Sequence, residues 1–256
     1  MSREEKMKKA KYPVEPFAIA LIMFTGTMKE AAVVGIILIV AACLGCVLRS
    51  VPVSGGQWTN SILTGLLTMG GIYSAFKYVG IEMEIIQLIG IGVIGLFTVR
   101  YVFLMRGKES ADELVRESAI AYGMLLVAAY FRELFGNGSV FDLEVTDRGF
   151  ISAAYLKPAF GFIVAGIGLG MTNRILGRYS EDESLWMLIP MVILFSPFVL
   201  SGVPEILGGL VGSAIALVAF MSVRGRMVFS APEKFMTKLP VHLISMGMIY
   251  MIMSVL

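Results

Sequence analysis

The sequence predicts an all-α polytopic membrane protein. Of its 256 residues, 57% are hydrophobic and only 16% are charged, and the mean hydropathy is +0.82. Soluble domains usually carry about 25% charged residues, so a chain with this composition is not a single soluble core with an apolar patch. The 28 glycines show no three-residue period and there are only two cysteines, which excludes collagen-like and disulfide-rich folds. A net charge of +2 gives no reason to expect a nucleic-acid partner.

Apolar runs between polar residues define about nine expected helical segments. A helix needs about 20 mainly apolar residues to cross a bilayer, and most of the runs have this length. They lie at 13–28, 31–49, 58–78, 84–105, 113–135, 150–172, 185–203, 206–223 and 239–256.

Two of these segments are expected to be broken or re-entrant. The first, 13–28, is short, and the seventh, 185–203, contains Pro190 and Pro197. Irregular backbone is tolerated at membrane depth only where protein or a water-filled cavity satisfies its polar groups. These two segments are therefore where we expect a functional site.

The acidic run at 179–184 separates six expected spans from the last three. Six spans in two groups of three fit the 3+3 inverted-repeat architecture that is common among membrane transporters. With the N-terminus in the cytoplasm and nine crossings, fifteen of the 21 Lys and Arg fall on the cytoplasmic side and five on the other. This distribution predicts that the loop at 106–112 is cytoplasmic and the loop at 136–149 is external.

One stretch carries a recognisable pattern. It reads FRELFGNGSVFDLEV from Phe131 and then FISAAYLKPAFGFIVAGIGLG up to Gly170. This stretch resembles the E/D-type integral-membrane subunit of the Rnf/Nqr family, whose fifth helix ends in a similar Arg-Glu, Gly-Asn-Gly and Leu-Phe-Asp sequence before a Pro-x-Ala-Phe start of the last helix. The matching residues are Arg132, Glu133, Gly136, Asn137, Gly138, Phe141, Asp142, Pro158, Ala159 and Phe160.

The resemblance implies a subunit of an ion-pumping oxidoreductase in a prokaryotic cytoplasmic membrane. In that family, oppositely oriented homologues pass electrons across the membrane together with flavin and iron–sulfur subunits. The resemblance assigns 1–178 to a six-span core, 179–184 to a linker and 185–256 to a three-segment C-terminal extension. Residues 198–201 and 231–251 resemble the A/E-type partner subunit, so the extension is either a partial second copy or a family-specific addition.

The family's cofactor is a [2Fe–2S] cluster near the bilayer midplane, held by one Cys from each of two broken helices in each partner. By alignment, Ile19 and Arg100 stand at these positions. Isoleucine has no donor atom for iron, and arginine has no available lone pair. We therefore expect the standard cluster to be missing from this chain's half of the site.

Cys43 and Cys46 are the two thiols of the chain. Their i, i+3 spacing puts both on one face of a helix, where they could supply two ligands to a [2Fe–2S] cluster shared with a partner subunit. The alternative is that they are small buried hydrophobic side chains.

Four charged residues are candidates for an ion path or an intramembrane charge. Arg100 lies inside the fourth segment, where a central arginine costs about 2.5–3.5 kcal/mol on insertion scales; it either replaces the missing cluster with a fixed charge or extends to the interface. Arg132 and Glu133 end the fifth segment, and as sequence neighbours one is expected to face protein and the other water. Glu30 follows the short first segment, as a cation ligand or an interfacial anchor.

No nucleophile–base arrangement and no phosphate-binding glycine pattern is visible in the sequence. The chain is therefore expected to be a non-catalytic or electron-relay subunit, surrounded by lipid and other membrane subunits, one of them an oppositely oriented homologue. A stand-alone secondary transporter or channel on the same scaffold is the alternative.

Overall fold

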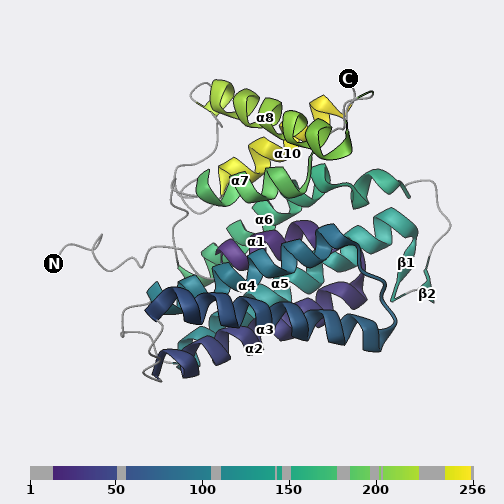
Figure 1. The fold of residues 1–256 in the computed structure, drawn as a ribbon. Helices are drawn as coiled ribbons and strands as arrows, with labels where there is room; N and C mark the ends of the chain where they lie inside the picture. Colours follow the sequence, from purple (N-terminus) through teal and green to yellow (C-terminus); the bar gives the residue numbers. More distant parts are fainter. Residues whose placement is uncertain are drawn as a thin grey trace.

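The computed structural model confirms the all-α class. It describes residues 14–50, 56–104, 111–141, 143–145, 151–177, 185–196, 202, 204–224 and 240–254. Within these ranges each of the nine expected segments contains an α-helix (Figure 1). The helices are α1 (Val14–Met23), α2 (Met28–Ser50), α3 (Gly56–Val79), α4 (Ile85–Leu104), α5 (Ala111–Asn137), α6 (Pro158–Leu176), α7 (Leu185–Leu194), α8 (Glu205–Arg224) and α10 (Val241–Met253).

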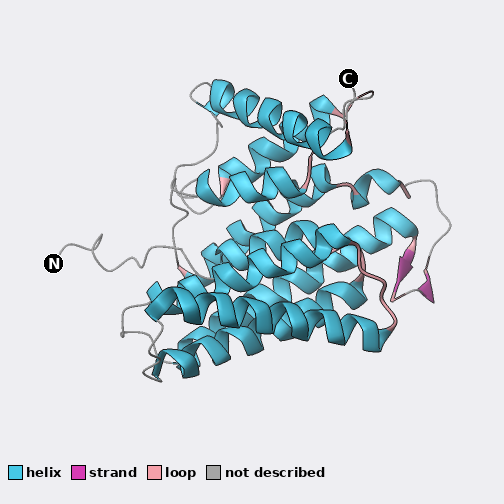
Figure 2. Cartoon of the chain, viewed as in Figure 1, coloured by secondary structure: helices cyan, strands magenta, loops and turns pink. Residues whose placement is uncertain are grey.

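Little else is regular in the described part of the chain. A short hairpin of β1 (Ser139–Val140) and β2 (Leu143–Glu144) follows α5, and the 3-10 helix η1 (Ala153–Leu156) precedes α6. Figure 2 shows the hairpin, in magenta, at one end of the helix bundle. The loop between α3 and α4 lies at the same end.

Three helices in the described residues are long and apolar enough to cross a bilayer. They comprise Leu114–Asn137 in α5, Pro158–Leu176 in α6 and Ile206–Val223 in α8. The outer face of α8 agrees with this, because Ile206, Leu207 and Val218 are all more than half exposed, and soluble monomers rarely expose such continuous apolar surface. The chain therefore has membrane-protein character, while nine crossings and a six-span core stay predictions.

The segments at 13–28 and 185–203 both contain short helices, while a broken or re-entrant course through the membrane stays a prediction. α1 and α7 have ten residues each, which at 1.5 Å per residue is about 15 Å, or half of the hydrocarbon thickness. α1 ends at Met23, and α2 begins at Met28. We call the intervening residues 24–27 the break.

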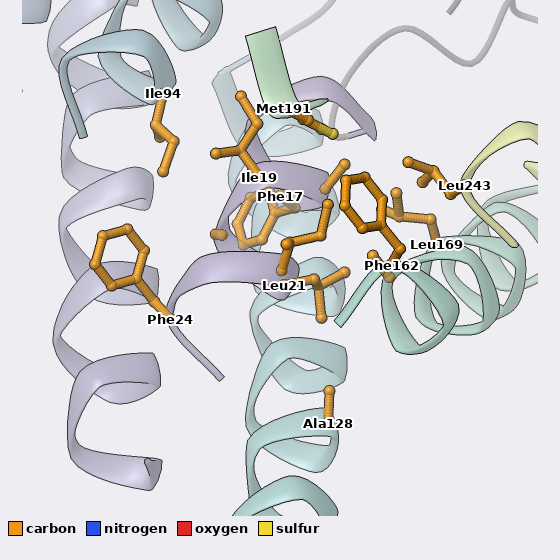
Figure 3. Close-up of a cluster of buried hydrophobic side chains, with 14 of the residues drawn as sticks. Phe17, Ile19, Leu21, Phe24, Ile94, Ala128, Phe162, Leu169, Met191 and Leu243 are labelled. Carbon is orange, nitrogen blue, oxygen red and sulfur yellow. The ribbon is translucent and has the colours of Figure 1, made fainter. Parts of the chain in front are cut away.

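α1 forms the centre of the bundle. Its residues 17–22 are all at most 2% exposed, and α4, α5 and α6 surround it. Figure 3 shows Phe17, Ile19 and Leu21 of α1 among side chains from neighbouring helices, with Met191 of α7 above them. The chain's own helices therefore cover residues 17–22 of α1, while an oppositely oriented partner subunit stays a prediction.

The C-terminal helices pack directly on the rest of the chain. α10 lies along α6, and α8 packs against α7 and α10. Gly247 of α10 allows a close approach, because a Cβ there would lie 2.9 Å from the Ala159 carbonyl oxygen and 3.1 Å from the Ile163 nitrogen. The acidic run at 179–184 lies outside the described residues, so the division into a core and an extension stays a prediction.

The contact between α6 and α10 can be tested at Gly247. We expect Gly247→Ala to lower the free energy of unfolding by about 1–3 kcal/mol, because the added methyl group meets backbone atoms of α6 that cannot rotate away. The matched control is Gly123→Ala in α5, where a Cβ would meet nothing within 4 Å. The measurement is thermal unfolding of both variants in detergent, and equal midpoints would contradict the close packing.

Candidate functional site

The most unusual polar group of the described chain is the guanidinium of Arg132 in α5. Its side chain is 1% exposed, the largest among the fully buried side chains. A buried arginine needs acceptors for its donors because it stays charged. The structure provides six acceptors, of which five are backbone carbonyls.

Half of these acceptors belong to the end of α1. Nη1 donates to the carbonyl oxygens of Leu21 at 3.3 Å and Ile22 at 3.1 Å, and to Thr25 Oγ1. The last four carbonyls of a helix receive no hydrogen bond from an amide of the same helix. A cation at this end also interacts favourably with the helix dipole. Arg132 therefore stabilises the position at which α1 stops.

The other half belong to the chain around η1. Nε donates to the carbonyl of Tyr155 at 3.0 Å, and Nη2 donates to those of Leu156 at 2.8 Å and Lys157 at 3.3 Å. These three residues lie immediately before α6. The single guanidinium thus holds the end of α1, the start of α6 and its own helix α5 together.

Glu133 bonds to the opposite side of the break. Its Oε2 accepts a hydrogen bond from the Met28 amide at 2.6 Å, and Met28 is the first residue of α2. The first amides of a helix have no acceptor within it, and an anion at this end is favourable. The cation therefore binds the carbonyl end of α1, while the adjacent anion binds the amide end of α2.

Both side chains are 1% exposed, so the expectation that one of them faces water is wrong. Neighbouring helical residues are separated by about 100° around the axis. At Arg132 and Glu133 this angle directs the two groups to the two sides of one break, and protein covers both.

Glu30 belongs to the same charge cluster. It lies in the first turn of α2, is half-buried, and interacts electrostatically with Arg132 and Glu133. Its backbone amide donates to Thr27 Oγ1 at 3.2 Å, which is the interaction of an N-capping threonine. Three of the four charged candidates, Glu30, Arg132 and Glu133, therefore come together at the break.

Glycines of the stretch 131–170, which carries the family resemblance, allow this close assembly. A Cβ on Gly161 of α6 would lie 3.0 Å from the Ile22 carbonyl oxygen, which Arg132 binds. A Cβ on Gly136 would lie 2.5 Å from Leu156 Cγ, and Gly138 has a φ of 72°, which favours glycine. Pro158 begins α6, where its missing N–H costs nothing.

The structure describes the remaining candidates, Cys43, Cys46 and Arg100, only in part. Cys43 is a half-buried free cysteine in α2, while the side chains of Cys46 and Arg100 lie outside the described residues. Ile19, at the family's first ligand position, is a fully buried hydrocarbon side chain. The described residues contain no group of three or more His, Cys, Asp or Glu that could hold a metal ion. The missing standard cluster and Cys43 and Cys46 as ligands therefore both stay predictions.

Sequence reasoning did not find the acceptors around η1. They are backbone carbonyls of Tyr155, Leu156 and Lys157, and backbone oxygens carry no residue-specific signal. The signals that the sequence does contain are the short first segment and a charged pair inside an apolar run.

Comparison with known proteins adds no relative. No family model matches the chain, no curated protein matches it, and no solved structure matches it.

The role of Arg132 can be tested by a substitution that keeps the charge. We expect Arg132→Lys to lower the free energy of unfolding by about 3 kcal/mol or more, because an ammonium cannot reach acceptors on both α1 and η1 and each buried group left without a partner costs about 1–3 kcal/mol. The matched control is Arg174→Lys at an exposed position in the last turn of α6. Unfolding in detergent measures both variants, and an Arg132→Lys protein as stable as the control would refute the role.

Proposed function

We propose that the chain is a membrane subunit of an Rnf/Nqr-like ion-translocating electron-transport complex. In this role it helps couple electron transfer to the movement of Na⁺ or H⁺ across a prokaryotic cytoplasmic membrane, with its N-terminus in the cytoplasm. The observation that carries the proposal is the position of the recognised stretch. Its Arg132 and Glu133 bond to the break between α1 and α2, and its Gly136 and Pro158 support the same unit.

Broken helices are the elements on which many membrane transport sites are built, because unwound backbone and helix ends can interact with ions. Here the break lies between a half-length helix and a full-length one. Glu30 and Glu133 place two carboxyl groups beside it, and Arg132 supplies one positive charge. This combination supports a role in ion coupling.

Substrate chemistry belongs to partner subunits in this proposal. Ile19 and Arg100 stand at the family's ligand positions in the alignment and cannot bind iron, so no electron-transfer step is assigned to the residues of this chain. Flavin and iron–sulfur subunits, together with an oppositely oriented homologue, supply the redox chemistry. The chain contributes the helix break and its charges.

One observation favours the second candidate, a stand-alone secondary transporter or channel. In the Rnf/Nqr arrangement, a homologous partner covers the broken helices. In this chain its own helices bury residues 17–22 of α1 to at most 2% exposure. A chain that covers α1 with its own helices has less need of a homologous partner at this position.

Purification from native membranes distinguishes the two candidates. We expect the tagged chain, extracted in a mild detergent, to co-purify with flavin-containing and iron–sulfur subunits, detected by visible absorbance and by native mass spectrometry. A tagged membrane protein of unrelated function, purified in the same way, is the control for adventitious association. A homogeneous homo-oligomer without flavin or iron would reject the subunit proposal and support the transporter.

A further inference from the structure

The hairpin after α5 has one apolar face and one polar face. Its register pairs Val140 with Leu143 and Ser139 with Glu144, and paired residues of a hairpin lie on the same face. Val145 is two residues after Leu143, so it shares the face of Val140 and Leu143. Its amide continues the ladder by donating to the Gly138 carbonyl at 2.9 Å.

The apolar face is exposed. Leu143 is 71% exposed and Val145 is 59% exposed, and Phe141 in the turn is 44% exposed. Phe141 also has a φ of 55°, an uncommon conformation for a bulky residue. Exposed apolar side chains grouped in this way are typical of a surface that contacts a protein or a membrane.

Continuity with the spanning helix indicates what covers the hairpin. Tyr130 and Phe131, in the last turns of α5, are exposed, and Phe131 stacks on Phe135 at a centroid distance of 5.9 Å. The hairpin begins two residues after α5 ends. Exposed aromatic side chains near the end of a candidate membrane span are therefore followed directly by the hairpin, and β1 contacts α5.

The loop between α3 and α4 repeats this feature at the same end of the bundle (Figure 1). Beside this loop, Tyr78 is 93% exposed and Ile85 is 75% exposed. Tyrosine is enriched where the hydrocarbon meets the headgroups. Two connections that are separate in the sequence thus expose aromatic and aliphatic side chains at the same end of the bundle.

We propose that the apolar face of the hairpin, formed by Val140, Leu143 and Val145, lies in the headgroup region of the lipid bilayer. The outer edges of a two-stranded hairpin have backbone groups that need water, which excludes the hydrocarbon core. Strands of two residues are also too short for strand addition by a protein partner, since strands usually have about five or six residues. The headgroup region satisfies both faces, with water for Ser139 and Glu144 and apolar contact for Leu143.

Spin labelling of the full chain tests the proposal. Leu143→Cys, Val145→Cys and the matched control Glu144→Cys each receive a nitroxide, and the proteins are reconstituted into phosphatidylcholine–phosphatidylglycerol vesicles. The labelled unsubstituted chain gives the background from Cys43 and Cys46. Collision with oxygen, which concentrates in lipid, is compared with collision with a water-soluble nickel chelate.

We expect the oxygen-to-nickel collision ratio to be severalfold higher at 143 and 145 than at 144. Equal ratios at the three positions would overturn the proposal, because the hairpin would then stand in water. Exclusion of both reagents at 143 would overturn it as well and would indicate that protein covers this face. All three positions are exposed, so the labels do not disturb a packed core.

Discussion

The structure depends on the interaction of Arg132 and Glu133 with the two ends of the break. When a helix stops inside a bundle, its last carbonyl groups and the first amide groups of the following helix have no partner within the helices. Each such group costs several kcal/mol if it is unsatisfied away from water. A buried arginine has the opposite need, because its five N–H donors all require acceptors. The break and the charged pair therefore stabilise each other, and neither would be favourable alone.

The central position of α1 follows from this interaction. A helix of about 15 Å cannot cross a bilayer by itself, yet α1 is almost completely buried by α4, α5 and α6. It can end there because Arg132 binds its carbonyls and Glu133 binds the first amide of α2. The same guanidinium orders the chain before α6, which positions Gly161 against α1. The break is thus the point at which α1, α2, α5 and α6 are joined.

Much of the fold could be predicted from the sequence, because apolar run length and proline position determine where membrane helices form. The expected segment at 206–223 and the helix Glu205–Arg224 differ by one residue at each end. The contacts of the site could not be predicted. Arg132 and Glu133 were candidates by type and position, but their partners are mostly backbone atoms brought close by tertiary packing. For the same reason, Arg132 and Glu133, as sequence neighbours, were expected to face protein and water, whereas tertiary packing buries both.

Amide hydrogen exchange at Met28 tests the central claim most directly. In the full chain, reconstituted in lipid nanodiscs, the account predicts that this amide is strongly protected and that Glu133→Ala removes most of the protection, because the Oε2 acceptor is lost. Glu82→Ala, at an exposed glutamate between α3 and α4, should leave the exchange unchanged. Equal protection of Met28 in the unsubstituted protein and in Glu133→Ala would contradict the account.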